Sequence, residues 1–146
     1  MSITKNNNFL HDLAFGNQSE NELIKVLSNS TLELKTDRFK NGRHAIELKK
    51  VVKGEVKPSG LSATKAEYYA LAKSNSYILI ATDDLKKIVQ QIYDECVESG
   101  RGGFNKTSGL FLLAGKFIMA GDGWRSYCLL LEESELLSRL EALRNA

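Results

Sequence analysis

Two segments of alternating polar and apolar residues, joined by an Asn-Gly pair, constrain the fold of this chain more than any other feature. Residues 32–39 (LELKTDRF) and 44–52 (HAIELKKVV) follow the two-residue period of a β-strand. Asn41-Gly42 lies between them, and Asn-Gly is a strong signal for a tight turn because both residue types tolerate positive φ. The sequence therefore predicts an antiparallel β-hairpin, although it does not define the length of its loop.

Helical and strand patterns surround this predicted hairpin. Before it, Ser19 and Glu22 form a capping box that predicts a helix beginning near Glu20. After it, the patterns predict, in chain order, a helix at 63–74, a strand at 77–81, a helix at 83–97, a glycine-rich loop at 100–109, strand or mixed structure at 110–120 and 126–131, and a helix at 132–144. This order predicts the α/β class, with a central mixed β-sheet flanked by helices.

The length and the composition are those of one globular domain. The chain has 146 residues, of which 42% are hydrophobic and 26% charged. We expect a flexible arm over residues 1–12 and a single domain over 13–146. No signal peptide or membrane span is evident, and Cys96 and Cys128 form no CxxC pair, so a reduced cytoplasmic protein is expected. The net charge of +2 means that any nucleic-acid binding must depend on local charge.

Acidic residues and a lysine form the most informative cluster. Glu47 and Lys49 are two residues apart in a predicted strand, so they are expected on the same face. Asp37 lies near the end of the predicted partner strand, and Glu20 falls among the apolar residues of the first helix. Carboxylates of this kind suit a hard cation such as Mg²⁺, which keeps several bound waters. An isolated Glu-x-Lys is weak evidence, because exposed strands often carry such solvated pairs.

The order of these residues resembles the motif of the PD-(D/E)xK nuclease superfamily. Glu20 in the first helix, then Asp37, then Glu47-Leu48-Lys49 match that order. Residues 16–23 (GNQSENEL) are similar to the start of the archaeal-type Holliday junction resolvases, and residues 58–71 (PSGLSATKAEYYAL) to a stretch that follows the catalytic hairpin in small phage-type members. The resemblance covers about residues 13–95, and Thr36 replaces the proline that names the superfamily.

This resemblance implies a restriction-endonuclease-like fold and a metal-dependent DNA endonuclease. Asp37 and Glu47 would bind Mg²⁺, with Mn²⁺ as an alternative, and Glu20 would complete the site directly or through water. Lys49 would assist the attacking water, and Glu33, on the same face as Asp37, is a candidate partner of the site. The expected substrate is branched or double-stranded DNA, cut by a homodimer similar to a Holliday junction resolvase, and the resemblance to phage-type members implies a phage-encoded protein that acts in the host cytoplasm. A non-catalytic DNA-binding module on the same fold, a DNA exonuclease and a structural protein remain alternatives.

Basic residues are concentrated around the proposed site. Residues 35–57 contain eight Lys or Arg and three acids, a surplus of five positive charges. Such a surplus suits contacts to the phosphate backbone of DNA. The alternative without a function in binding is a solvated edge strand that its lysines protect. The candidate DNA-binding residues are Arg38, Lys40, Arg43, Lys50 and Lys65.

Other residues have two interpretations of similar weight. Tyr68 and Tyr69 could stack on DNA, but at least one of them is expected in the core. The apolar residues of 110–120 and of the last helix, including Leu136 and Leu137, could form a dimer surface or complete the core.

Overall fold

The computed structural model describes residues 31–36, 42–73 and 76–146, and it is a mixed α/β structure. The strands are β1 (Leu32–Thr36), β2 (Arg43–Val52), β3 (Glu55–Pro58), β4 (Tyr68–Lys73), β5 (Ser76–Ala81), β6 (Gly103–Phe104), β7 (Phe111–Leu112), β8 (Phe117–Ala120) and β9 (Ser126–Glu132). The helices are α2 (Thr82–Glu98), α3 (Glu133–Arg144) and the short 3₁₀ helices η1 (Gly60–Ser62) and η2 (Asp122–Trp124).

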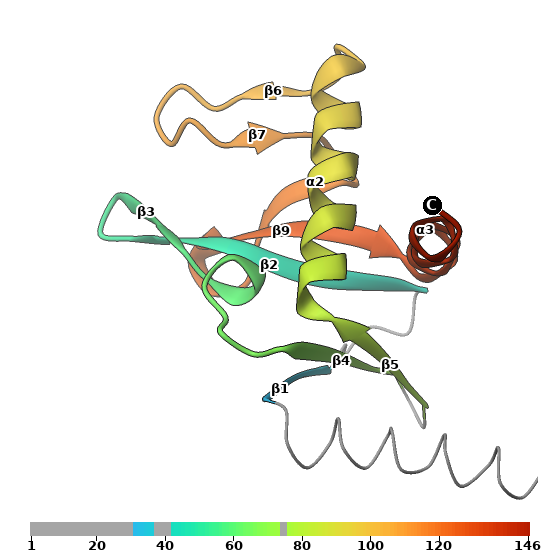
Figure 1. The fold of residues 1–146 in the computed structure, drawn as a ribbon. Helices are drawn as coiled ribbons and strands as arrows, with labels where there is room; N and C mark the ends of the chain where they lie inside the picture. Colours follow the sequence, from blue (N-terminus) through green and yellow to red (C-terminus); the bar gives the residue numbers. More distant parts are fainter. Residues whose placement is uncertain (1–30, 37–41, 74–75) are drawn as a thin grey trace, which may run out of the picture.

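Three groups of paired strands make up the β-structure (Figure 1). The largest is an antiparallel sheet in the order β3-β2-β9-β8. A second sheet has the order β1-β4-β5 and is mixed, because β1 is parallel to β4 and β4 is antiparallel to β5. The small β6–β7 pair lies at the far end of α2, and α3 lies at the end of β9 (Figure 1).

Helix α2 contributes one side of the hydrophobic core. Its buried apolar residues follow the 3.6-residue period that predicted this helix: Leu85, Ile88, Val89, Ile92 and Cys96. They belong to one buried cluster with β2 and β9 side chains such as Ile46 and Leu129. Each large apolar side chain buried in this way contributes about 1.5–3 kcal/mol to folding. Burial on one face of α2 therefore fixes the helix against the antiparallel sheet.

Several predicted elements are confirmed. The strand expected at 77–81 is β5, and the helices expected at 83–97 and 132–144 are α2 and α3. The strand expected at 44–52 is β2, and residues 126–131, expected as strand or mixed structure, form β9. The strand expected at 32–39 is described only as far as Thr36. Among the described residues, no helix has the length and the apolar composition needed to cross a membrane.

The predicted hairpin between residues 32–39 and 44–52 is wrong. In the described part of the chain, β1 pairs with β4 and not with β2. One edge of β2 is occupied by β9, and the other by β3, which follows β2 through a turn at Lys53 and Gly54. Both turn residues have positive φ, 51° and 79°, as a two-residue hairpin turn requires. The Lys53-Gly54 turn therefore forms a different hairpin, of β2 with β3, which the sequence analysis did not predict.

The helix predicted over 63–74 is also wrong, because that stretch contains strand β4. β4 pairs with β1 on one side and β5 on the other, and Tyr69 and Leu71 are buried. The residues before it have helical propensity, but propensity is a weak influence where a central strand gains two partners and buries a large tyrosine. Lys65, expected on the first turn of that helix, instead lies between η1 and β4.

Candidate functional site

Glu47 lies half-buried in the wall of a cavity between the two larger sheets. It pairs with Cys128 of β9, and the cavity has a volume of about 480 Å³. Tyr69 of β4 and the residues Lys35 and Thr36 at the end of β1 also line this cavity. Thr36 immediately precedes Asp37 in the sequence. The end of β1 and the middle of β2 thus meet at one cavity although the two strands do not pair.

A second carboxylate, Glu33, lies in the neighbourhood of the same tyrosine. Glu33 is the register partner of Tyr69, and burial first, then the charges of Glu33 and Glu47, raise the pKa of Tyr69 to about 12. Burial, followed by the charge of Glu47, raises the pKa of Cys128 to about 11. These directions show that Glu47 acts electrostatically on groups from both sheets. Among the described residues that line this cavity, Glu47 is the acidic residue and Lys35 the lysine.

Glu33 is held by two polar neighbours. Its Oε1 lies 3.0 Å from the Lys35 Nζ, and Thr64 Oγ1 donates a hydrogen bond of 3.4 Å to its Oε2. Thr64 lies in the segment between η1 and β4, so this bond links that segment to β1. Glu33 is not among the residues that line the cavity of Glu47, so its role as a partner of the site stays a prediction.

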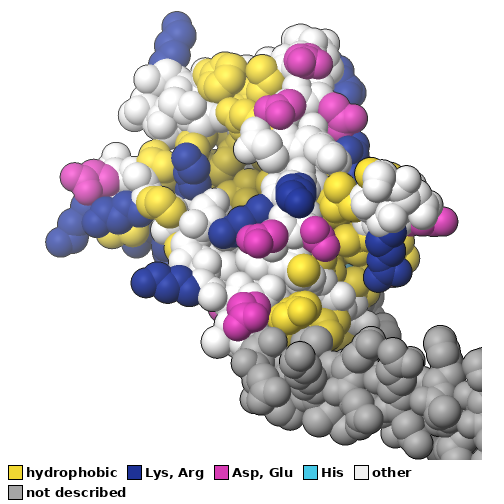
Figure 2. Space-filling view, viewed as in Figure 1, with side chains coloured by type: hydrophobic (Ala, Val, Ile, Leu, Met, Phe, Trp, Pro, Cys, Tyr) yellow, Lys and Arg dark blue, Asp and Glu magenta, His cyan; other side chains and the backbone are white. Residues whose placement is uncertain are grey.

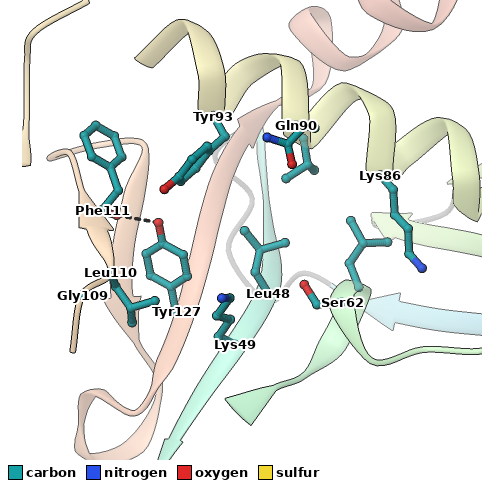
Figure 3. Close-up of a pocket in the computed structure, with 12 residues that line it drawn as sticks. Leu48, Lys49, Ser62, Lys86, Gln90, Tyr93, Gly109, Leu110, Phe111 and Tyr127 are labelled. Atoms are coloured by element: carbon teal, nitrogen blue, oxygen red, sulfur yellow. Dashed lines mark hydrogen bonds between the residues drawn. The ribbon is translucent and has the colours of Figure 1, made fainter. Parts of the chain in front are cut away.

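Lys49 does not share a cavity with Glu47. A β-bulge lies between them: Glu47 pairs with Cys128, and Lys49 pairs with Tyr127. Since Tyr127 and Cys128 are adjacent in β9, their side chains point to opposite faces of the sheet. Lys49 accordingly lines a second cavity, of about 520 Å³, beside α2 (Figure 3). The expectation that Glu47 and Lys49 point the same way is wrong, because one extra residue reverses the alternation.

The remaining predicted site residues are distributed over the chain. Glu20, Asp37, Arg38 and Lys40 lie outside the described residues. Arg43 is half-buried, with its Nε 4.0 Å from Glu132 Oε1. Lys50 and Lys65 are exposed.

The described carboxylates do not form a complete metal site by themselves. No group of three or more His, Cys, Asp or Glu residues suited to a metal ion occurs within the described parts of the chain. Glu47 offers an oxygen ligand of the kind that a hard cation prefers, and Mg²⁺ requires only one or two carboxylates when it keeps its waters. The chemistry of Glu47 fits Mg²⁺, and the expected further ligands Asp37 and Glu20 lie outside the described residues.

Exposed lysines cover the β2–β3 hairpin. Figure 2 shows Lys and Arg side chains gathered over this hairpin, at the left of the view. Lys50, Lys53 and Lys57 are exposed there, and Glu55 is the neighbouring acid, 3.8 Å from Lys57. The hairpin therefore offers a projecting basic surface, the kind that contacts phosphates without reading base sequence.

Gly60 is a site residue that the sequence analysis did not single out. Its φ is +50°, and a Cβ atom at this position would lie 2.3 Å from the carbonyl oxygen of Glu47. Only glycine allows η1 to approach the backbone of Glu47 so closely. The available signal was the Ser59-Gly60 pair after Pro58, within the stretch that resembles phage-type nucleases.

Comparison of the chain with protein-family models, with curated proteins and with solved structures finds no significant match.

Proposed function

We propose that this protein is a Mg²⁺-dependent DNA endonuclease that is selective for branched DNA. The observation that carries the proposal is the position of Glu47, half-buried in a cavity that also contains Thr36, the residue before Asp37. Glu47 thus lies at the cavity, and Asp37 follows a residue of its lining in the sequence. The motif order itself, from Glu20 through Asp37 to Glu47 and Lys49, supplies the rest of the argument.

The proposed roles follow from the chemistry of the side chains. Asp37 and Glu47 hold the cation, and Glu20 completes its surroundings directly or through water. The cation, when bound, acidifies a water molecule and stabilises negative charge at a phosphodiester. Lys35 holds Glu33 in place beside the site, through the 3.0 Å ion pair. Lys50, Lys53 and Lys57 of the hairpin contact the DNA backbone.

A second candidate function is a DNA-binding module without nuclease activity. The observation that favours it is the bulge, which places Lys49 and Glu47 at different cavities. In the nuclease proposal Lys49 assists the attacking water, which requires the bulge to move so that Lys49 returns to the face of Glu47. The binding module requires no such change.

A cleavage assay separates the two candidates. Linear, nicked, flapped and four-way DNA are incubated with the protein in Mg²⁺, in Mn²⁺ and in chelator. The nuclease proposal expects cleavage of branched substrates with either metal and none in chelator. Binding of the same DNA without cleavage in either metal would contradict the nuclease and support the binding module.

Variants assign the chemistry to the proposed residues. Glu47→Gln and Asp37→Asn should each reduce cleavage by at least about a hundredfold and leave DNA binding nearly unchanged, because metal binding and phosphate contacts use different groups. Glu55→Gln is the matched control, since Glu55 is an exposed acid of the adjacent strand β3. Full cleavage by Glu47→Gln would refute the assignment.

A further inference from the structure

The cavity beside α2 has the size and the lining of a ligand site. Its volume of about 520 Å³ falls within the range of small-molecule pockets. It is lined by residues of β2, η1, α2, β9 and the segment 109–111 that leads into β7 (Figure 3). Five segments of the chain therefore build one concave surface.

Two lysines give this cavity a positive potential. Lys49 of β2 and Lys86 of α2 both line it, with Lys49 beside Tyr127, Lys86 on the opposite side and Ser62 of η1 between them (Figure 3). None of the described residues that line the cavity is acidic. Neither lysine forms an ion pair with another residue in the described part of the chain. Two unpaired ammonium groups at one cavity favour an anionic ligand, and phosphate is a common partner of lysine.

The end of the cavity opposite Lys86 is aromatic, and Lys49 lies beside it (Figure 3). Tyr93 of α2 is half-buried there, and its ring is held by edge contacts to Phe111 and Phe117, with centroids 5.8 and 5.5 Å apart. Tyr127 donates a hydrogen bond to the Phe111 carbonyl oxygen, and burial raises the pKa of its phenol, so it stays uncharged. Leu48, Leu61 and Val89 add apolar surface. This end suits a flat, apolar group.

We propose that this cavity binds one unpaired nucleotide of a DNA strand, with its phosphate at Lys86 and its base against Tyr93. A ligand with a flat ring and an adjacent anion matches the division of the cavity into an aromatic end and a basic end. A base within an intact duplex is stacked and paired, so only an unpaired nucleotide enters. This inference rests on the proposed function in taking DNA as the ligand, and it provides a physical reason for a preference for branched DNA.

The first test measures binding of three small probes in the presence of chelator. The probes are deoxyadenosine monophosphate, deoxyadenosine and inorganic phosphate. The monophosphate should bind at least about tenfold more tightly than either of the others, because it alone uses both ends of the cavity. Equal affinity for inorganic phosphate would reduce the cavity to a simple anion site and overturn the proposal.

Neighbouring lysines provide a matched pair of variants. Lys86 lines the cavity, whereas Lys87, the next residue of α2 and equally charged, does not. Lys86→Ala should weaken binding of the monophosphate about five- to tenfold, and Lys87→Ala should leave it unchanged. Tyr93→Leu should weaken binding of the monophosphate and the nucleoside but not that of phosphate. Equal effects of the two lysine variants would overturn the proposal.

The same variants applied to DNA distinguish this inference from the nuclease proposal. Lys86→Ala should weaken binding to a duplex that contains one unpaired nucleotide, relative to a fully paired duplex, without any metal present. Glu47→Gln should leave this preference intact, since Glu47 lines the other cavity. If the protein prefers the duplex with the unpaired nucleotide but does not cleave DNA, the nucleotide site is supported and the nuclease proposal is contradicted. If the protein cleaves DNA but does not prefer the duplex with the unpaired nucleotide, only the nucleotide-site proposal is contradicted.

Discussion

At the scale of single residues, Gly60 determines how closely η1 approaches Glu47. A Cβ atom there would lie 2.3 Å from the Glu47 carbonyl oxygen, whereas a Cβ atom at Gly54 would meet nothing within 4 Å. Both glycines have positive φ, +50° and +79°, so an alanine is strained at either position. An alanine at Gly54 would therefore introduce backbone strain alone, and an alanine at Gly60 would add a steric conflict with Glu47.

We expect Gly60→Ala to lower the free energy of unfolding by about 2–3 kcal/mol, and Gly54→Ala by about 1 kcal/mol. The additional loss arises because the backbone of Glu47 must move. Urea unfolding measures both variants, and Gly54→Ala serves as the control. Equal losses in the two variants would show that the contact with Glu47 is unimportant for stability.

Glu135 joins three parts of the structure through its charge. Burial acts to raise the pKa of this carboxyl, but a hydrogen bond from Lys116 and the charges of Lys116 and Arg139 outweigh it and lower the pKa. Lys116 Nζ lies 2.9 Å from Glu135 Oε2, and Arg139 Nε lies 3.2 Å from Glu135 Oε1. Arg139 also pairs with Glu95 of α2. The pairs connect α3 with α2 and with the residue before β8.

Glu135→Gln should reduce stability by about 1 kcal/mol at neutral pH. Because the folded-state pKa lies below the ordinary value of 4.5, the carboxylate stabilises the fold above that value. The contribution is lost as the pH falls through the lowered folded-state pKa, so the two proteins should converge in acid. Urea unfolding over a pH series measures the difference, and Glu141→Gln, an exposed acid of α3, is the control. A difference that persists unchanged in acid would contradict this.

At the scale of elements, the β2–β3 hairpin concentrates exposed positive charge. We expect the double variant Lys53→Ala/Lys57→Ala to weaken DNA binding about tenfold at low salt, equally for all base sequences. The variant should also make the affinity less dependent on salt, because fewer counterions are released on binding. Binding titrations at several salt concentrations measure both effects.

The control for the hairpin is a second double variant, Lys87→Ala/Arg144→Ala. It removes the same charge from α2 and from the end of α3, away from the hairpin. If this control weakened DNA binding as much as the hairpin variant, binding would depend on net charge and not on the hairpin.

At the scale of the whole molecule, most of the apolar residues considered for a dimer surface, in 110–120 and in α3, are buried in the core. Leu110, Phe111, Phe117 and Leu136 are buried within the protomer, and Leu137 is 49% exposed. Other exposed apolar side chains lie on one face of the β1-β4-β5 sheet: Leu32, Leu34, Tyr77 and Leu79. The interpretation of 110–120 and the last helix as core is thus favoured over that of a dimer surface.

We still expect a homodimer that prefers four-way DNA junctions, because two sites related by a twofold axis can match the symmetry of a junction. Sedimentation equilibrium measures the mass, and cleavage of junction and linear DNA is compared at equal concentration. Junction cleavage should fall symmetrically on opposed strands. A monomer that cuts linear and four-way DNA equally would contradict the resolvase proposal, while the general nuclease proposal would survive.

The sequence by itself determined the elements whose residues carry a clear period over a continuous stretch. The apolar residues of α2 recur every three or four positions, and those of β2 and β5 fall within short runs rich in β-branched residues. The position of Glu47 on a strand was predictable for the same reason. These features depend on neighbouring residues alone, so local pattern suffices to predict them.

Only the tertiary structure decided which strands pair and on which face each side chain lies. β4 is a strand because it gains partners on both edges, and β2 pairs with β3 and β9 because those strands meet its edges in space. The bulge after Glu47 sends Lys49 to the other cavity, and a single extra residue leaves no mark on the local pattern. Strand pairing and bulges are choices between segments far apart in the chain, and the energy that decides them is the burial of both segments together.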